Sequence, residues 1–272
     1  MHGIVINLEP LIFRLGSFEL RWYSLAILAG VAAAVFIAAY RGQRKGIPRD
    51  EFYAMLPWVL LGGILGARLV HIIDRWGYYA SHPALILQIQ QGGLAIWGGL
   101  AGGGLALVLY ARIRHLPLWR LLDAVTIGLL AAQIIGRLGC IVNGDAYGGI
   151  TSLPWAFIYV NPDAMIPANL LGVPTHPYPV YEMLWNGLVL WYLLTVGRRF
   201  TRDGQLFLSY LAFYSLGRFA LTFVRQENIT LWGLQQAQVL AVMIMMASVA
   251  LFIYRSRRGK PHLAAGSPAS AA

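Results

Sequence analysis

The stretch Gly136-Arg-Leu-Gly-Cys-Ile-Val-Asn-Gly-Asp-Ala-Tyr-Gly-Gly149 carries an arginine from the end of an apolar helix, Leu121 to Ile135, into an Asn-Gly turn. An arginine at such a depth in hydrocarbon is costly unless an anion or a polar cavity receives it. Arg137 therefore predicts an anionic ligand within the membrane. The alternative is that its side chain reaches the interface or pairs with a structural carboxylate.

The composition around this stretch is that of a membrane protein. The chain has 272 residues, of which 58% are hydrophobic and 12% charged. A soluble domain of this length carries about twice that charged fraction, so lipid is the solvent for much of the surface. The net charge of +10 lies in short basic clusters between apolar runs, which argues against nucleic-acid binding. The single cysteine, Cys140, excludes an intrachain disulfide, and the histidines lack metal-ligand spacing, so we expect no metal and no cofactor.

Seven apolar runs are long enough to cross the hydrocarbon as helices, which takes about 20 residues each. They cover residues 22–40, 52–73, 94–112, 121–141, 180–197, 205–223 and 235–254. We therefore predict an all-α polytopic membrane protein with seven transmembrane helices, forming a single domain over residues 1–260.

Basic residues gather in alternate connections between these runs, and this pattern predicts the orientation. They cluster at 41–49, 112–120, 198–202 and after residue 254. Of the connections between these clusters, one holds Arg75, another holds Arg225, and the long 142–179 segment holds no lysine or arginine. Basic connections are normally cytoplasmic. The N-terminus is therefore expected outside and the C-terminus in the cytoplasm, with residues 261–272 as a disordered tail.

Three arginines lie inside the predicted spans, at Arg68, Arg137 and Arg218. The acids available to pair with them within the membrane are few: Asp74, Asp123 and Glu182. Buried cations with scarce internal counter-ions predict an external anion, and a phospholipid phosphate is the one a membrane offers most readily. The planar guanidinium also suits two phosphate oxygens better than an ammonium group does.

Glycines cluster before Arg68 and again at 92–104, with small residues four apart. This spacing lets helix backbones approach closely, so tight packing and the wall of an intramembrane cavity are both open interpretations. The 142–179 segment is rich in proline and glycine but contains an apolar, aromatic stretch at 153–160. We expect it to fold as a small outer-face cap between the fourth and fifth helices.

Taken together, these motifs resemble those of the prolipoprotein diacylglyceryl transferases, bacterial inner-membrane enzymes that begin lipoprotein maturation. The family signature is similar to Gly-Arg-x-Gly-Asn-x-x-Asn-Gly-Glu-x-x-Gly, and the chain has Gly136-Arg137-Leu-Gly139-Cys140-Ile-Val-Asn143-Gly144-Asp145-Ala-Tyr-Gly148. Further blocks match in the same order: Arg21-Trp22-Tyr23, Gly66-Ala-Arg68, Gly92-Gly93 with Gly98-Gly99, His176-Pro177 with Tyr181-Glu182, and Tyr214 with Gly217-Arg218.

The resemblance implies transfer of the diacylglyceryl group of phosphatidylglycerol to the thiol of a lipobox cysteine in a prolipoprotein signal peptide. A thioether forms and glycerol phosphate leaves. Arg137 and Arg218 are then expected to clamp the phosphate and leaving group, with Tyr23 and Asn143 placing the headgroup as further catalytic residues. The residues expected to bind phosphatidylglycerol are Arg68, Arg137, Arg218, Asn143, Gly148, Glu182, Tyr181, Tyr214, Gly98, Gly99 and Trp97.

The chain departs from the family pattern at several positions. Cys140 and Asp145 stand where asparagine and glutamate are usual, and Thr222 stands where some members carry an acid. Trp97 stands where many members have a histidine that has been considered a general base. His71, one turn after Arg68, is a candidate substitute because it lies on the same helical face.

Two other functional classes remain open from the sequence. A lipid-binding protein that has lost catalysis would keep the arginines, and Trp97 favours that interpretation. A transporter of anions or lipids would also bury arginines, but no inverted repeat relates the two halves. We expect a bacterial inner-membrane protein that acts as a monomer on phosphatidylglycerol and a prolipoprotein.

Overall fold

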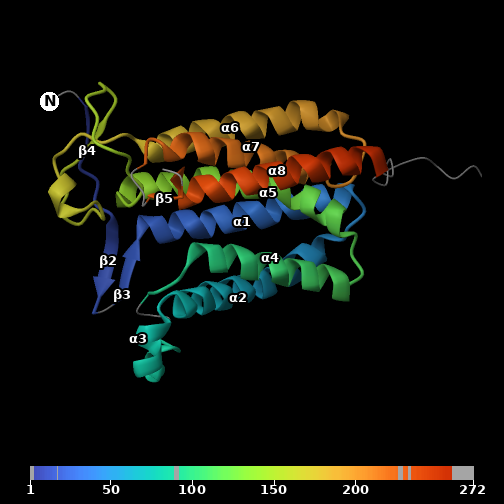
Figure 1. The fold of residues 1–272 in the computed structure, drawn as a ribbon, viewed down its shortest axis with the longest axis horizontal. Helices are drawn as coiled ribbons and strands as arrows, with labels where there is room; N and C mark the ends of the chain where they lie inside the picture. The colour runs from blue at the N-terminus through green and yellow to red at the C-terminus, as the bar shows by residue number, and fades with distance from the viewer. Residues whose placement is uncertain (1–2, 17, 89–91, 226–228, 232–233, 259–272) are drawn as a thin grey trace, which may run out of the picture. The chain divides into compact units, whose positions relative to one another are not determined.

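The computed structural model describes residues 3–16, 18–88, 92–225, 229–231 and 234–258, and most of this length is helical (Figure 1). Helices occupy all seven apolar runs, and the predicted ranges are correct to within about one helical turn. They are α1 (Trp22–Arg44), α2 (Arg49–Asp74), α4 (Ile96–Ile113), α5 (Leu118–Asn143), α6 (Tyr178–Thr195), α7 (Gln205–Thr222) and α8 (Gln236–Arg258).

Five helices in the described part of the chain are long and apolar enough to cross a membrane: α1, α2, α4, α5 and α8. The protein is therefore an all-α polytopic membrane protein. Helices α6 and α7 have 18 residues each and are not among these five. Their buried side chains include Glu182 and Asn186 in α6, and Ser209, Ser215 and Thr222 in α7. Their polarity thus faces the protein interior.

Several short elements were not predicted from the sequence. They are the helix α3 (Trp76–Ser81), the 3-10 turns η1 (Pro83–Leu85), η3 (Ala168–Leu170) and η4 (Val196–Arg199), and the strands β1 (Ile4–Ile6), β2 (Leu11–Leu15), β3 (Phe18–Arg21), β4 (Phe157–Tyr159), β5 (Ile229–Leu231) and β6 (Leu234–Gln235). Strands β2 and β3 pair as an antiparallel hairpin, as do β5 and β6, while β1 pairs in parallel with β4. Elements this short leave no periodic pattern in a sequence.

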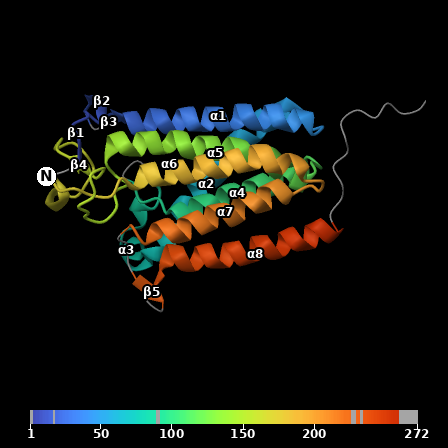
Figure 2. The same cartoon turned by 90° about the horizontal axis from the view of Figure 1, so that it is seen from above.

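Two compact units make up the chain, and each is described by itself: Met1–Ala38 with Leu122–Ala272, and Ala39–Leu121. In the first unit α1, α5, α6, α7 and α8 run lengthwise beside one another (Figures 1 and 2). Its core joins three of these helices through Ile127 and Leu130 of α5, Val189 and Leu193 of α6, and Leu206 and Tyr210 of α7. The single domain expected over residues 1–260 stays a prediction, and the expected disordered tail at 261–272 lies outside the described residues.

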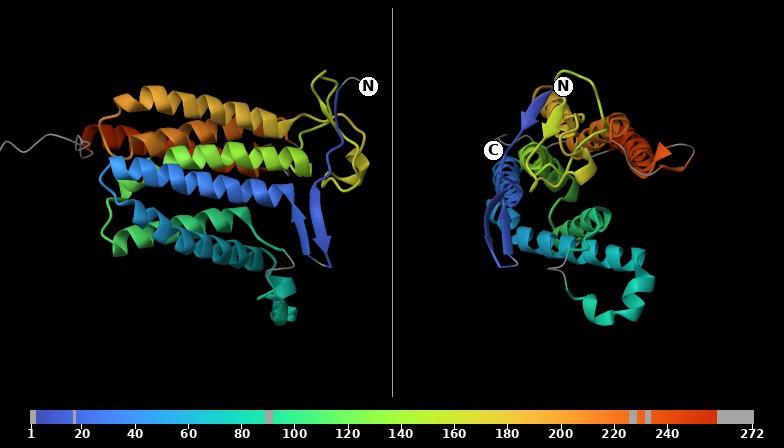
Figure 3. Two further views of the ribbon diagram at one scale, coloured as in Figure 1. Left: turned by 180° about the vertical axis from the view of Figure 1, so that it is seen from behind. Right: turned by 90° about the vertical axis from the view of Figure 1, so that its left-hand side faces the viewer.

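The 142–179 segment folds at one end of this bundle around β4 (Figure 3). Phe157, Tyr159, Ala164 and Ile166 form its buried cluster, and Ile6 of β1 packs against them. Burial of the Tyr159 hydroxyl, together with the nearby charge of Asp145, raises its pKa above the ordinary tyrosine value. The segment is therefore a packed cap with its own core.

The second unit is held together by glycine contacts between α2 and α4. A Cβ atom on Gly66 would lie 2.9 Å from the Cα atom of Gly102 and would overlap the carbonyl oxygen of Gly98. Gly62 meets Gly102 and Ala106 in the same way. The small residues four apart thus allow two helix backbones to touch, as their spacing indicates.

Asp123 of α5 caps the start of α7 inside the first unit. Its side chain is fully buried, and its carboxylate accepts hydrogen bonds from the backbone N–H groups of Gly204 at 2.8 Å and Phe207 at 3.0 Å. The first N–H groups of a helix have no partner within the helix, so a carboxylate at this position also complements the helix dipole.

Asp123→Ala is expected to lower the free energy of unfolding by about 2–4 kcal/mol, because it leaves one buried and one partly buried N–H group without an acceptor. Thermal unfolding in detergent checks this, with the exposed Asp74→Ala as the matched control. Equal melting temperatures for the two variants would contradict the capping role.

Candidate active site

The motif around Arg137 spans the last turns of α5 and the turn that follows. Gly139 lies against α1, where an added Cβ atom would sit 2.7 Å from the Cβ of Ala26 and 3.1 Å from the Cα of Tyr23. The helix ends at Asn143, and Gly144 reverses the chain with a φ of +75°, which a residue with a side chain rarely adopts. Gly139 thus lets the end of α5 that carries Arg137 pack closely against Tyr23, while Gly144 packs against the cap.

Arg137 forms an ion pair with Glu182 of α6 through its Nε atom. Its Nη1 atom lies 3.7 Å from the sulfur of Cys140, and its Nη2 atom makes no hydrogen bond to any residue in the described ranges. The Arg137 side chain is 25% exposed, while that of Glu182 is 7% exposed. Arg137 therefore keeps an accessible N–H edge while its charge is held in place by a buried carboxylate.

Arg218 of α7 reaches the same carboxylate from the other side. Its Nη1 atom lies 3.3 Å from Oε1 of Glu182 and donates a hydrogen bond of 2.6 Å to the hydroxyl of Tyr178. That hydroxyl in turn donates to Oε1 of Glu182 at 3.0 Å. Helices α5 and α7 thus meet α6 at Glu182, which binds one arginine through each of its two carboxylate oxygens.

Further charged groups lie around the Glu182 carboxylate. Arg225 is a third guanidinium, with its Cζ atom 5.4 Å from the centre of the Tyr178 ring. Asp145 lies nearby, interacting electrostatically with Cys140 and Tyr23, and its buried Oδ1 atom has no hydrogen-bond partner among the described residues. The accessible N–H edge of Arg137 offers an anionic ligand a charge-assisted hydrogen bond at this place.

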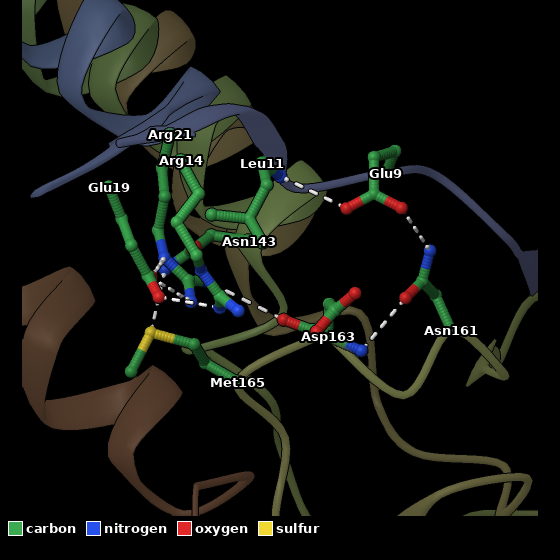
Figure 4. Close-up of polar contacts among 9 residues, drawn as sticks. All are labelled: Glu9, Leu11, Arg14, Glu19, Arg21, Asn143, Asn161, Asp163 and Met165. Carbon is green, nitrogen blue, oxygen red and sulfur yellow. Dashed lines mark hydrogen bonds and ion pairs between the residues drawn. The ribbon is translucent and has the colours of Figure 1, made fainter. Parts of the chain in front are cut away.

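Asn143 belongs to a polar cluster that joins α5 to the N-terminal hairpin and the cap (Figure 4). Its Oδ1 atom accepts a hydrogen bond from Arg21 at 3.3 Å, and its Nδ2 atom contacts the sulfur of Met165 at 3.5 Å. Arg21 also forms an ion pair with Glu19 at 3.0 Å. Hydrogen bonds from Arg21, and to a smaller extent from Arg14, lower the pKa of the Glu19 carboxyl. Asn143 is 3% exposed and is therefore fixed by protein contacts.

The chain was compared with known proteins. The family model described as prolipoprotein diacylglyceryl transferase matches residues 10–254. The chain belongs to the prolipoprotein diacylglyceryl transferase family. Proteins named phosphatidylglycerol–prolipoprotein diacylglyceryl transferase are similar to it over nearly their whole length. The one from Limosilactobacillus reuteri is 34% identical over 265 residues, covering 95% of each chain.

Two further relatives of the same name extend the comparison. The protein of Lactobacillus acidophilus is 35% identical over 265 residues, covering 96% of this chain and 94% of its own. The protein of Dehalococcoides mccartyi is 36% identical over 256 residues, covering 94% of this chain and 96% of its own. The diacylglyceryl transferase family thus accounts for both units of the chain.

Other residues expected at the site of this diacylglyceryl transferase also lie in the first unit. Tyr214 of α7 interacts electrostatically with Glu182 and with both Arg137 and Arg218. Tyr181 lies at the start of α6, where its hydroxyl accepts a hydrogen bond of 2.9 Å from Trp155. Tyr214 therefore lies at the arginine pair, whereas Tyr181 contacts the cap through Trp155.

Gly148 is placed where the motif meets the ends of α6 and α7. Its N–H donates to the carbonyl of His176 at 3.0 Å, and an added Cβ atom would lie 2.7 Å from the Cβ of His176 and 3.0 Å from the carbonyl oxygen of Val224. Only a residue without a side chain fits between these groups. In the structure Gly148 contacts protein backbone, and its contact with lipid stays a prediction.

Arg68 lies in the second unit, where backbone carbonyl groups surround its guanidinium. It donates to the oxygens of Leu85 at 2.5 Å, Ile86 at 2.9 Å, Gly92 at 2.8 Å and Gly93 at 3.1 Å, and it is 6% exposed. The sequence suggested a phosphate ligand for Arg68, whereas these contacts fasten the chain before α4 to α2. Its contact with lipid stays a prediction.

Arg68→Lys is expected to free this segment, because one ammonium group cannot donate to four carbonyl groups placed around a planar guanidinium. Amide hydrogen exchange of the peptide 92–99 should speed up at least about tenfold, which corresponds to about 1.4 kcal/mol. Unchanged exchange there would show that the carbonyl contacts do not hold the segment. Exchange in α8 serves as the internal control.

Trp97, Gly98 and Gly99 also belong to the second unit. Trp97 is 37% exposed, while Gly98 and Gly99 pack against Gly66 and Ala67 of α2. His71 lies beside Gly93, edge-on to the ring of Tyr79 at 5.9 Å. The expected lipid contacts of Trp97 and the two glycines, and the role of His71 as a base, stay predictions.

Tyr178 and Arg225 were not predicted as site residues, although Arg225 with Gln226 also matches the family pattern after Arg218. Tyr178 is four residues before Glu182, so the two side chains share a helical face once α6 is known to begin at Tyr178. The sequence placed the start of this helix at residue 180, because the proline on each side of Tyr178 restricts the backbone. An earlier helix start would have brought Tyr178 to the site.

Proposed function

We propose that this protein transfers the diacylglyceryl group of phosphatidylglycerol to the thiol of the lipobox cysteine of prolipoproteins. Membership of the family carries this function. The observation that supports it in the site is the pair of arginines, Arg137 and Arg218, joined through Glu182 with an accessible N–H edge on Arg137.

The reaction forms one carbon–sulfur bond and breaks one carbon–oxygen bond. The sulfur of the prolipoprotein cysteine attacks the carbon of the diacylated glycerol that is bonded to the phosphate, and the phosphate leaves with the headgroup glycerol and the bonding electrons as glycerol phosphate. The thiol proton is released. Because the nucleophile arrives with the substrate, the protein needs to supply a cationic setting and the correct orientation of the two substrates.

Arg137 and Arg218 supply that setting in this proposal. Negative charge grows on the phosphate as the carbon–oxygen bond breaks, so guanidinium groups held beside it stabilise the transition state more than the ground state. The same charges favour the thiolate form of an incoming cysteine, whose unperturbed pKa is about 8.5. This route to the thiolate needs no histidine at position 97.

Further residues have proposed roles within each of the two units. Tyr23, Tyr214 and Tyr181 offer hydroxyl groups to the lipid headgroup, while Glu182 holds the two arginines. Asn143 supports the end of α5 through its hydrogen bond with Arg21 and its contact with the cap. Arg68 shapes the chain before α4, where Trp97, Gly98 and Gly99 follow.

We further propose that α6 and α7 cross the membrane with the other five helices, which makes seven spans. The distribution of basic residues supports an N-terminus outside and a cytoplasmic C-terminus in the bacterial inner membrane. The 142–179 cap then lies on the outer face. The protein is proposed to act as a monomer.

A transfer assay with the detergent-solubilised protein tests this function. Phosphatidylglycerol and a lipobox peptide are supplied, and glycerol phosphate release is followed with the cysteine peptide and with its serine counterpart. Release that needs the cysteine is the expected result for the parent and for Trp97→His. If the parent released no glycerol phosphate while Trp97→His did, the protein would instead be a lipid-binding protein that has lost catalysis.

A further inference from the structure

Tyr178 occupies the centre of the arginine cluster and is fully buried at the first position of α6. Its ring centre lies 5.9 Å from the Cζ atom of Arg137 and 5.4 Å from that of Arg225. Both distances allow attraction between a cation and the electron-rich face of the ring, and this attraction strengthens where water is excluded. The ring therefore contacts two cations of the site at once.

The hydroxyl of Tyr178 makes a second set of contacts at the same place. It accepts a hydrogen bond from Arg218 at 2.6 Å and donates one to Oε1 of Glu182 at 3.0 Å. A hydroxyl is suited to this position because it can accept and donate simultaneously. One side chain thus touches Arg137, Arg218, Arg225 and Glu182.

We propose that Tyr178 is a positioning residue for diacylglyceryl transfer, fixing the guanidinium of Arg218 through its hydroxyl and those of Arg137 and Arg225 through its ring. This inference rests on the proposed role of Arg137 and Arg218 as the phosphate clamp. Guanidinium groups stabilise a developing charge only when they already point at it, so loss of the hydroxyl affects the chemical step more than lipid binding.

Two substitutions separate the hydroxyl from the ring. Tyr178→Phe keeps the aromatic face and removes the hydroxyl, and it is expected to lower kcat about tenfold to a hundredfold while the KM for phosphatidylglycerol changes less than about threefold. Tyr178→Leu removes both and should lower kcat further and raise KM. A purely structural tyrosine would reduce the melting temperature and the yield of folded protein while leaving kcat of the folded fraction unchanged.

The chain provides a matched control in its second unit. There the hydroxyl of Tyr110 donates to Glu51 at 2.8 Å, and Glu51 pairs with Arg114 at 2.7 Å. Tyr110→Phe therefore removes the same kind of tyrosine–glutamate hydrogen bond beside an arginine. Its kcat and KM are expected to equal those of the parent.

Coupling to Arg218 distinguishes this inference from the clamp on which it rests. Tyr178→Phe is measured alone and in an Arg218→Lys background, where the hydroxyl no longer has a guanidinium to hold. The loss in kcat from removing the hydroxyl should shrink at least fivefold in that background. Equal losses in both backgrounds, or a parental kcat for Tyr178→Phe, would overturn the positioning role. Full activity of Arg137→Ala and Arg218→Ala would overturn the clamp instead.

Discussion

Alanine in place of Arg137 is expected to lower kcat/KM for diacylglyceryl transfer by about a hundredfold to a thousandfold, as the loss of one preorganised donor to a developing anion does in other enzymes. The guanidinium is held by Glu182 and presents its unbonded Nη2 edge, so nothing else in the described residues replaces its charge at that position. Glycerol phosphate release from phosphatidylglycerol with a lipobox peptide measures the effect.

Two further arginine variants serve as controls for this experiment. Arg137→Lys retains the charge but lacks the planar fork, so it should recover only part of the lost activity. Arg114→Ala removes an arginine that likewise pairs with a glutamate, but on an exposed part of the second unit, and should retain parental activity. An Arg137→Ala protein that is folded and as active as Arg114→Ala would contradict the clamp.

Glu182→Gln is expected to produce the largest loss of stability, because it leaves Arg137 and Arg218 in a mostly buried site without their carboxylate. Removing one partner of a buried ion pair costs about 3–5 kcal/mol. A bound phosphate would take over as counter-ion. The fall in melting temperature should therefore be smaller in micelles that contain phosphatidylglycerol than in micelles of zwitterionic phosphatidylcholine.

Glu51→Gln is the control for this measurement, since its partner Arg114 is 56% exposed and such pairs contribute at most about 1 kcal/mol. Its melting temperature should change little and should not depend on the lipid headgroup. If Glu182→Gln lost the same stability in both lipids, the arginines would not be exchanging a carboxylate for a phosphate.

The helices and the main motif could be predicted from the sequence because both leave local patterns. Seven apolar runs became seven helices, and the turn after Asn143 follows from a glycine with positive φ. The strand pair β1–β4 could not be predicted, since it joins Ile4–Ile6 to Phe157–Tyr159 across most of the chain. Pairing over such a distance has no signature in either short segment.

The site shows the same division between local pattern and tertiary context. The sequence identified Arg137, Arg218 and Glu182 because buried charges are rare in a membrane chain. It could not show that Glu182 lies between the two arginines, nor that the guanidinium of Arg68 donates its hydrogen bonds to backbone carbonyl groups. Those facts depend on which chain segments fold against each side chain.

The most direct test of the phosphate clamp compares phosphatidylglycerol with its methyl phosphotriester, in which the phosphate carries no charge. Transfer rates on both donors are measured for the parent and for the Arg137→Ala and Arg218→Ala variants. We expect the parent to prefer the charged donor strongly and each variant to lose at least about tenfold of that preference, equivalent to about 1.4 kcal/mol. The same preference in all three proteins would contradict a role for these arginines in holding the phosphate.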